Sequence, residues 1–282
     1  MSSLIISLIP EHKLYCEPFF GGGAVFFAKP QSEMEVINDL NDWVITFYKV
    51  IKTDFGILKM LIDQTVSSRS IHREAAFILK NSKNFNDIKV AWAFWVQTNM
   101  SFSSGIFGGY GYGLDSRVIK AINNKKTAFN KSLTKRIENT DIENNDAIKV
   151  IKSRDSSDAF FYIDPPYFNS DCGQYKGYTE KDFIDLLNCL EKIKGKFLLS
   201  SYPSDILNSY IERNNFHVYQ KESPISVTYL TKKTKTEQLT GNYNFNALMA
   251  SKPVAVKKQN THLLLEKKSG KLTPLVSIKW AK

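Results

Sequence analysis

The spacing of apolar residues in the first 55 positions predicts alternating strands and helices. An apolar run over residues 14–20 ends in three glycines, and a second run over residues 35–40 ends near Asp39. Short apolar runs closed by turn residues are typical of buried strands, whereas residues 43–51 repeat their apolar positions with helical spacing. We expect a further helix directly after the glycines, which close the first strand with a turn. This succession is the opening unit of a doubly wound α/β domain.

The pattern changes over residues 56–140. This region comprises helical patterns over residues 58–62 and 73–79, a dense aromatic stretch over 90–96, a loop rich in Gly and Ser over 99–113, and a basic helix over 116–136. We interpret Trp92, Phe94 and Trp95 as core residues, because a compact aromatic stretch is more often buried than exposed for stacking. The region is predicted to be a mainly helical insertion.

Strand patterns return after the insertion. We expect strands over residues 159–163, 196–200, 217–219 and 225–227, a helix over 181–192, and a strand-like stretch over 261–266 within a basic tail. The α/β domain therefore comprises residues 1–55 and 141–282.

Charge and composition narrow the class of protein. The 282 residues are 43% apolar and 23% charged, which is typical of a globular protein and excludes a disordered chain or a fibre. The formal net charge is +10, and residues 231–282 alone hold 11 Lys against 2 Glu. Concentrated positive charge suits a phosphate backbone, although a solvated basic surface would have the same composition.

Cysteine usage and the N-terminus point to a cytoplasmic protein. Cys16, Cys172 and Cys189 are widely spaced, so neither a disulfide framework nor a zinc site is predicted, and we expect no metal. The apolar residues before Pro10 are too few for a signal sequence or a membrane span, so no membrane association is expected.

The glycines carry the first candidate chemistry. Phe19-x-Gly21-x-Gly23 follows a predicted strand, where glycine lets a ligand approach the backbone closely. Gly-Lys-Ser/Thr is missing, which argues against a phosphate-binding P-loop. Asp39 ends the next strand, where a Rossmann-like fold places a carboxylate for ribose hydroxyls. A plain turn and a helix-capping Asp would account equally well for these residues taken alone.

Asp164-Pro165-Pro166-Tyr167 follows a predicted buried strand and forms a second candidate site. The two prolines fix φ and carry no N–H, which leaves nearby carbonyls free to accept hydrogen bonds. Asp164 is another acceptor, and Tyr167 offers a flat face for stacking. Such a corner suits a planar group with an exocyclic amine, and an adenine flipped out of duplex DNA is a group of that kind.

Together the two motifs resemble those of amino-methyltransferases that use S-adenosylmethionine, and their order resembles the Dam-type DNA adenine-N6 methyltransferases. Further matching stretches are residues 15–19, 37–41, 145–147, 199–203, 235–237 and 242–243. The resemblance implies a Rossmann-like seven-stranded methyltransferase sheet with helices on both faces. It also implies that residues 56–140 are the target-recognition insertion, which would bind double-stranded DNA.

The resemblance assigns residues to two sites. Catalytic roles fall on Asp164, Pro165, Pro166 and Tyr167, and the cofactor-binding residues are Glu17, Phe19, Phe20, Gly21, Gly23, Asp39, Leu40, Asp146, Asp164, Trp280 and Lys282. Phe19, Gly21 and Gly23 would line the methionine moiety, with Glu17 nearby. Asp39 would hold the ribose, Leu40 would pack on the cofactor adenine, and Asp146 would accept from its amino group.

Trp280 and Lys282 are assigned to the cofactor site because we propose that the chain is a circular permutation of the family's usual order. Dam-type enzymes usually carry a Lys-Trp-Ala-Gly-Gly-Lys-like segment before the glycine strand, where it helps to close the cofactor pocket. Here the helix predicted over residues 2–9 stands in its place, and Lys-Trp-Ala-Lys lies at residues 279–282. We expect residues 262–282 to return beside that helix; a basic tail with a chance match is the alternative.

DNA contacts are predicted in the insertion. The candidate residues are Arg69, Arg73, Ser103, Gly109, Tyr110, Arg117 and Lys120. Arg and Lys contact phosphates, and the loop over residues 99–113 could enter a groove.

The predicted function is transfer of a methyl group from S-adenosylmethionine to adenine N6. Hydrogen bonds from N6 to the Asp164 carboxylate and the Pro165 carbonyl would free the nitrogen lone pair for attack. Cytosine-N4 methylation is an alternative, as is methylation of RNA or of a glutamine amide. A catalytically silent nucleic-acid-binding partner is the alternative from another class. The enzyme would act alone, or beside a restriction endonuclease with which it forms no stable complex, and it would act on DNA at the nucleoid. The sequence determines neither the DNA site that the enzyme recognises nor the oligomeric state of the enzyme.

Overall fold

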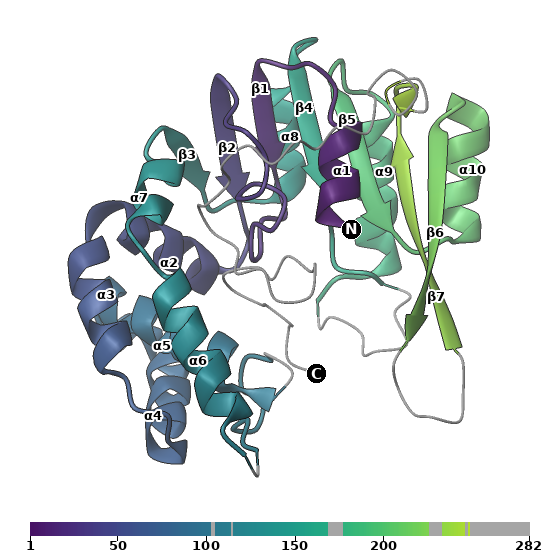
Figure 1. Ribbon diagram of the computed structural model, residues 1–282. Helices are drawn as coiled ribbons and strands as arrows, with labels where there is room; N and C mark the ends of the chain where they lie inside the picture. Colours follow the sequence, from purple (N-terminus) through teal and green to yellow (C-terminus); the bar gives the residue numbers. More distant parts are fainter. Residues whose placement is uncertain (103–104, 114, 169–176, 226–232, 246–247, 249–282) are drawn as a thin grey trace.

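A computed structural model describes residues 1–102, 105–113, 115–168, 177–225, 233–245 and 248 of the chain (Figure 1). Ser103, Trp280 and Lys282 lie outside the described residues, and so do the stretch 261–266 and residues 226–227 of the last predicted strand. Within the part that is described, no helix is long and apolar enough to cross a membrane.

Seven strands form one mixed sheet in the order β3–β2–β1–β4–β5–β7–β6 (Figure 1). They are β1 (Leu14–Glu17), β2 (Met34–Asn38), β3 (Thr140–Glu143), β4 (Ala159–Ile163), β5 (Lys196–Ser201), β6 (His217–Ile225) and β7 (Lys233–Gly241). The first five strands pair in parallel, and β7 pairs antiparallel with both β5 and β6. All five residues of β4 are buried, as expected of a central parallel strand covered on both faces.

Helices cover both faces of this sheet. They are α1 (Ser2–Leu8), α2 (Asp42–Thr53), α3 (Phe55–Gln64), α4 (Arg69–Lys80), α5 (Asp87–Met100), α6 (Arg117–Ala128), α7 (Ser132–Ile137), α8 (Ala147–Arg154), α9 (Glu180–Leu190) and α10 (Asp205–Asn214), with a 3-10 turn η1 (Ser82–Asn84). Successive strand residues point to opposite faces. Accordingly Phe161 and Phe197 share a core with α8, α9 and α10, whereas Phe160 and Leu198 share a core with α1 and α2. The predicted α/β class is confirmed.

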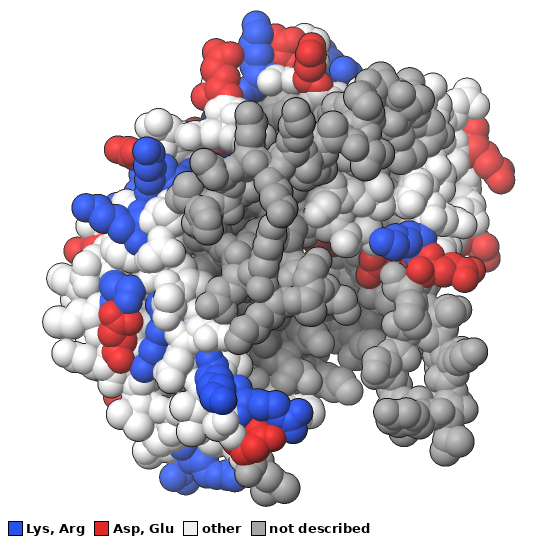
Figure 2. Space-filling model, in the orientation of Figure 1, with Lys and Arg blue, Asp and Glu red and all other residues white. Residues whose placement is uncertain are grey.

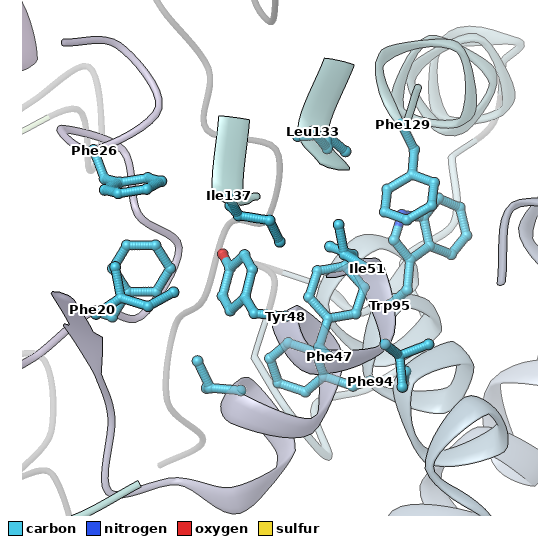
Figure 3. Packing of buried hydrophobic residues seen from close by; sticks show 14 of the residues in the cluster. Phe20, Phe26, Phe47, Tyr48, Ile51, Phe94, Trp95, Phe129, Leu133 and Ile137 are labelled. Carbon is cyan, nitrogen blue, oxygen red and sulfur yellow. The ribbon is translucent and has the colours of Figure 1, made fainter. Parts of the chain in front are cut away.

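The second core continues from the sheet into the helical region. Figure 3 shows Phe20 and Phe26, from the segment after β1, beside Tyr48 and Phe47 of α2, with Phe94 and Trp95 of α5 beyond them. All six side chains are buried, so Phe94 and Trp95 are core residues as predicted. In Figure 1 helices α3 to α6 lie to one side of the sheet, joined to it through α2.

The helix predicted after the glycines is not formed. Residues 21–29 form successive turns, in which the Phe27 N–H donates to the Gly23 carbonyl at 2.9 Å. In a continuing helix the Phe26 carbonyl would accept from the N–H of residue 30, but residue 30 is a proline, which has no N–H and ends a helix. The Phe26 carbonyl accepts from the Arg136 guanidinium instead, at 2.7 Å.

The basic helix predicted over residues 116–136 is two helices, α6 and α7. The chain leaves the helical conformation at Phe129, whose ring stacks on Phe55 at 5.2 Å between centroids. Four elements were not predicted: β3, β7, α8 and α10. The strand predicted over residues 217–219 and the first residue of the strand predicted over 225–227 belong to one continuous strand, β6, which ends at Ile225.

Candidate active site and DNA interface

The strand order changes direction around β1, which pairs in parallel with β2 on one side and β4 on the other. Ligands of open α/β sheets bind in the crevice beyond the carboxyl ends of the strands at such a switch point. Three carboxylates from separate parts of the sequence meet these ends: Glu17 closes β1, Asp39 follows β2, and Asp164 follows β4. The sheet thus brings the glycine motif and the Asp-Pro-Pro-Tyr motif to one edge.

The glycine loop is fixed by the Asp39 carboxylate. The Gly21 N–H donates to one carboxylate oxygen at 2.8 Å, and the Asn41 N–H donates to the other at 2.9 Å. Gly21 has a φ of +49°, in the left-handed region that favours glycine, and a Cβ there would meet open space. The loop therefore presents bare backbone to the crevice, which is the feature that a closely approaching ligand requires.

Phe20 lies in the core rather than at the crevice. Its ring is 3% exposed and meets Phe26 and Tyr48 edge-on. A Cβ on Gly23, where φ is +60°, would lie 2.5 Å from the Phe20 ring. Phe20 therefore supports the loop from beneath, and Gly23 is needed for that packing. Phe19 is only partly buried and lies edge-on to Tyr178 at 6.2 Å.

Leu40 and Asn38, the neighbours of Asp39 in the chain, differ in their exposure to solvent. Leu40 is 75% exposed beside the crevice, so its apolar side chain is available to a ligand ring. Asn38 is fully buried, and its amide nitrogen donates to the Pro18 and Asn145 carbonyls at 2.9 and 3.0 Å. Its amide oxygen accepts from the Asn145 N–H at 2.8 Å. Asn38 thus joins the loops that follow three adjacent strands.

Asp146 is the N-cap of α8. One carboxylate oxygen accepts from the Lys149 N–H at 3.0 Å, and the residue is exposed. A capping carboxylate keeps acceptor capacity for a further donor. Its position after β3 places it at the same sheet edge as Asp39.

Glu17 is a buried carboxyl. It is 2% exposed, and the Tyr15 hydroxyl donates to it at 2.5 Å. Burial raises the pKa of Glu17 to about 8, and the nearby Asp164 contributes in the same direction, against the opposing effects of the Tyr15 hydrogen bond and of Lys29. Burial also raises the pKa of Asp39, although its two backbone hydrogen bonds oppose that shift. A cation placed in the crevice would favour the ionised form of both acids.

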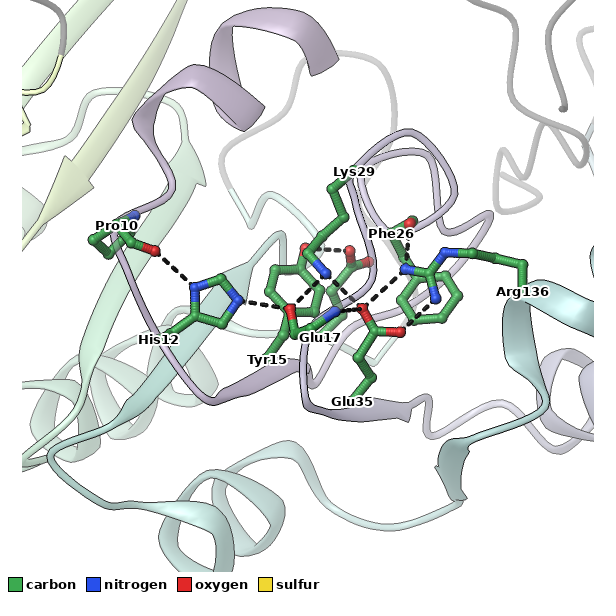
Figure 4. Close-up of polar contacts among 9 residues, drawn as sticks. Pro10, His12, Tyr15, Glu17, Phe26, Lys29, Glu35 and Arg136 are labelled. Carbon is green, nitrogen blue, oxygen red and sulfur yellow. Dashed lines mark hydrogen bonds and ion pairs between the residues drawn. The ribbon is translucent and has the colours of Figure 1, made fainter. Parts of the chain in front are cut away.

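A buried ion cluster anchors the segment after the glycines (Figure 4). Glu35 of β2 accepts from Lys29 at 2.5 Å and from Arg136, which also stacks over the Phe26 ring at 3.6 Å. Lys29 lies 4.1 Å over the ring of Tyr15. Burial alone would raise the pKa of Glu35, but the hydrogen bonds from its two cations hold it below the usual value.

Two tyrosine hydroxyls face the carboxylate of Asp164. The Tyr162 hydroxyl lies 3.5 Å from one oxygen and the Tyr167 hydroxyl lies 3.3 Å from the other. Ser200, at the end of β5, contacts the Tyr167 hydroxyl at 2.9 Å, and the Tyr202 ring lies 4.5 Å from that of Tyr167. Asp164 itself is exposed. The corner thus has an exposed acid whose orientation is supported by neighbouring strands, and no group of three His, Cys, Asp or Glu side chains in the described ranges could hold a metal ion.

Four of the predicted DNA contacts meet in one pocket of the helical region. Arg69, Arg73, Gly109 and Tyr110 line it, together with His72, Ala76, Lys80, Phe107 and Gly108. Arg69 lies over the rings of Tyr110 and Tyr112, at 5.6 and 4.7 Å from their centroids. Ser67 contacts the Tyr110 hydroxyl at 2.8 Å. The pocket therefore combines exposed cations with aromatic rings that are held in place.

Arg117 and Lys120 do not line this pocket. Both are exposed on α6, and Arg117 forms an ion pair with Asp115 at 2.7 Å. In Figure 2 blue Lys and Arg side chains gather over the lower helical part of the molecule, where α4 and α6 lie in Figure 1, with few acidic side chains among them.

The sheet order, the glycine loop and the acidic strand ends together define a Rossmann-like methyltransferase. Residues 1–238 match the family described as D12 class N6 adenine-specific DNA methyltransferase. The chain therefore belongs to this family. It is an enzyme that methylates adenine N6 in DNA, and family membership implies S-adenosylmethionine as its methyl donor. The predicted family and reaction are confirmed, and the alternatives of cytosine-N4 methylation and of a catalytically silent nucleic-acid-binding partner are not supported.

Two curated relatives are similar over most of their length. The type II methyltransferase M.MjaIII of Methanocaldococcus jannaschii is 26% identical over 243 residues, which cover 72% of this chain and 78% of the relative. The type II methyltransferase M1.LlaDCHI of Lactococcus lactis subsp. cremoris is 26% identical over 237 residues, which cover 77% and 81%. Among solved structures, a precorrin-6y C5,15-methyltransferase from Geobacter metallireducens GS-15 is 7% identical with a TM-score of 0.36, over 85% of each chain.

Several residues of the site were given no role by the sequence. Asn38, Tyr162 and Ser200 position the acids and loops, and Lys80 and Phe107 complete the pocket. Asn38 and Ser200 lie in stretches that match the family, and that was the signal that could have found them.

Proposed function

We propose that the crevice beyond β1, β2 and β4 binds S-adenosylmethionine next to an adenine flipped out of duplex DNA. The observation that carries this proposal is the meeting of the glycine loop, Asp39 and Asp164 at one sheet edge. The open space at Gly21 and the exposed apolar side chain of Leu40 fit a cofactor with a ribose and a purine ring. Phe19, Glu17 and Asp146 complete the proposed cofactor site.

The bound cofactor supplies an electrophilic methyl group on a sulfonium. Asp164 and the Pro165 carbonyl accept the two N–H groups of adenine N6, which frees the nitrogen lone pair to bond to the methyl carbon as the carbon–sulfur bond breaks. Transfer would leave the electron pair of the broken bond on the sulfur, and N6 would release one proton to Asp164 or water. Tyr167 stacks on the adenine. The tyrosine hydroxyls beside Asp164 hold its carboxylate in the accepting orientation.

The helical region over residues 56–140 is proposed to hold the DNA. Arg69 and Arg73, with Gly109 and Tyr110, support this role because cations beside aromatic rings suit a phosphate backbone next to bases. Arg117, Lys120 and Ser103 are proposed as further contacts. Since both curated relatives are named type II methyltransferases, a companion endonuclease that shares the recognised sequence is part of the proposal. Such an enzyme would act on the nucleoid in the cytoplasm.

Methyl transfer from labelled S-adenosylmethionine to unmethylated duplex DNA tests the proposal, with the product nucleosides identified by mass. The wild type should form N6-methyladenine. Asp164→Ala should lose about 100- to 1,000-fold in rate at saturating cofactor, because an acceptor for the reacting amine is gone. Asp158→Ala is the matched control, since Asp158 is exposed and pairs with Lys13 at 3.4 Å. Equal rates for the two variants would refute the role of Asp164.

The tail over residues 262–282 is proposed to close the cofactor pocket through Trp280 and Lys282. Trp280→Ala should then weaken cofactor binding in isothermal titration calorimetry without a change in melting temperature. Unchanged affinity would exclude the circular permutation as a source of cofactor contacts.

A further inference from the structure

Phe107 stands between the proposed DNA pocket and the cofactor loop. It lines the pocket with Arg69 and Arg73, and Lys80 lies 5.3 Å over its ring. On its other side the ring meets Trp43 of α2 edge-on, with 5.6 Å between centroids and 89° between planes. The contact joins the loop over residues 105–113 to the helix that begins directly after the cofactor-binding strand end.

Phe107 is held in an unfavourable backbone conformation. Its φ is +61°, which is uncommon for a bulky side chain. The Phe107 N–H donates to the side-chain oxygen of Gln97 at 3.0 Å, and Gln97 is fully buried with its nitrogen donating to the His72 carbonyl at 2.7 Å. Such conformations persist only where the surroundings enforce them, and they gather at functional sites. The loop is therefore built to keep this ring against Trp43.

Hydrogen bonds continue from Trp43 to the glycine loop. The backbone N–H of Trp43 donates to the side-chain oxygen of Asn41 at 2.8 Å, and the backbone N–H of Asn41 donates to the Asp39 carboxylate at 2.9 Å. The other Asp39 oxygen accepts from the Gly21 N–H at 2.8 Å. A contiguous set of contacts thus runs from the cationic pocket to the backbone that faces the cofactor.

We propose that Phe107 and Trp43 are positioning residues that couple DNA binding to cofactor binding. The inference rests on the proposed function. A DNA phosphate bound at the Arg69 and Arg73 pocket fixes the Phe107 ring, the ring fixes the start of α2, and Asp39 then holds Gly21 in the conformation that the cofactor requires. Each ligand strengthens the other by the same factor, because coupling between two binding sites is reciprocal.

The test measures the affinity for S-adenosylhomocysteine by calorimetry, with and without unmethylated plasmid DNA that the wild type methylates fully. The wild type should bind at least about 5-fold more tightly with DNA. In Phe107→Ala this ratio should fall below about 2-fold at DNA concentrations that saturate the variant. Phe102→Ala is the matched control, because that ring is 74% exposed, and it should keep the wild-type ratio.

Variants at Trp43 test the same contact independently, from the residue that Phe107 touches. Trp43→Leu should also lose the coupling, and Trp43→Phe should retain it by keeping an aromatic ring against Phe107. A coupling ratio that is absent in the wild type, or is unchanged in both Phe107→Ala and Trp43→Leu, would overturn the inference even if methylation proceeds normally. A wild type that binds neither ligand would instead refute the proposed function.

Discussion

The strand ends and the helical pocket handle charge in opposite ways. At the strand ends Glu17 and Asp39 are buried, and each has hydrogen-bond donors from the protein itself. In the pocket Arg69 and Arg73 are exposed, with ring faces beside Arg69 as the main support. Buried acids fix geometry at a cost in desolvation, whereas exposed cations cost little and attract a partner at a distance. The difference fits an enzyme that prepares its chemistry before DNA arrives and leaves the proposed recognition surface adaptable.

The largest effect on the acidic side of this comparison is expected from removing Glu35, which holds the buried ion cluster beneath the segment after the glycines. In Glu35→Ala the buried Lys29 and the largely buried Arg136 lose their shared partner, which should lower the free energy of unfolding by about 3–5 kcal/mol. Urea unfolding measures the change. Asp141→Ala is the control, because Asp141 forms an exposed pair with Arg154 and its loss should cost under about 1 kcal/mol. A similar small cost for both would mean that the cluster does not anchor the loop.

The raised pKa of Glu17 gives this region a pH dependence. The folded protein holds the proton up to about pH 8, whereas the unfolded chain releases it near the ordinary value of 4.5. The stabilisation is therefore complete below the unfolded pKa and is lost as the pH rises towards 8, on the order of 4 kcal/mol between pH 5 and 8. Glu17→Gln should lack this slope, so the difference between the free energies of unfolding of the two proteins, measured in urea, should change with pH by this amount. Parallel curves for wild type and variant would contradict it.

Gly23 tests the packing beneath the glycine loop. Gly23→Ala puts a Cβ against the Phe20 ring at a φ of +60°, so we expect a loss of about 2–4 kcal/mol in unfolding free energy. Cofactor affinity should fall as well. Gly56→Ala is the matched control, because a Cβ there meets open space on α3 and should stabilise by about 0.5–1 kcal/mol. Losses of equal size would show that the loop has no special constraint.

The smallest effect is expected in the helical pocket. Arg73→Ala should leave unfolding unchanged, weaken DNA binding by about 1 kcal/mol and reduce the slope of log affinity against log salt by about one. Fluorescence anisotropy across a salt series measures both quantities. Arg213→Ala, on α10 with Glu191 as its partner, should change neither. If the two variants behave alike, the pocket is not a phosphate contact.

Local sequence was enough to predict the strands that position the candidate site residues. β1 and β4 have short apolar runs because both faces of a parallel sheet are covered, and β2 has the apolar pair Val36 and Ile37; each strand is closed or followed by a predicted site residue. The order of the glycine and Asp-Pro-Pro-Tyr motifs then indicated the family. The paired β7 escaped prediction because Lys233–Gly241 is mostly polar, and its place in the sheet comes from pairing with β5 and β6 on both sides.

The sequence by itself therefore determined the fold class, the reaction and the residues at the strand ends, since those signals lie within short stretches. Only the tertiary structure decided that Phe20 packs inward, that Arg136 donates to the Phe26 carbonyl, and that Phe107 reaches Trp43. Each of these contacts joins residues far apart in the chain or depends on a side chain's direction. No periodic pattern records such pairings, because many partners of similar chemistry would satisfy the same local sequence.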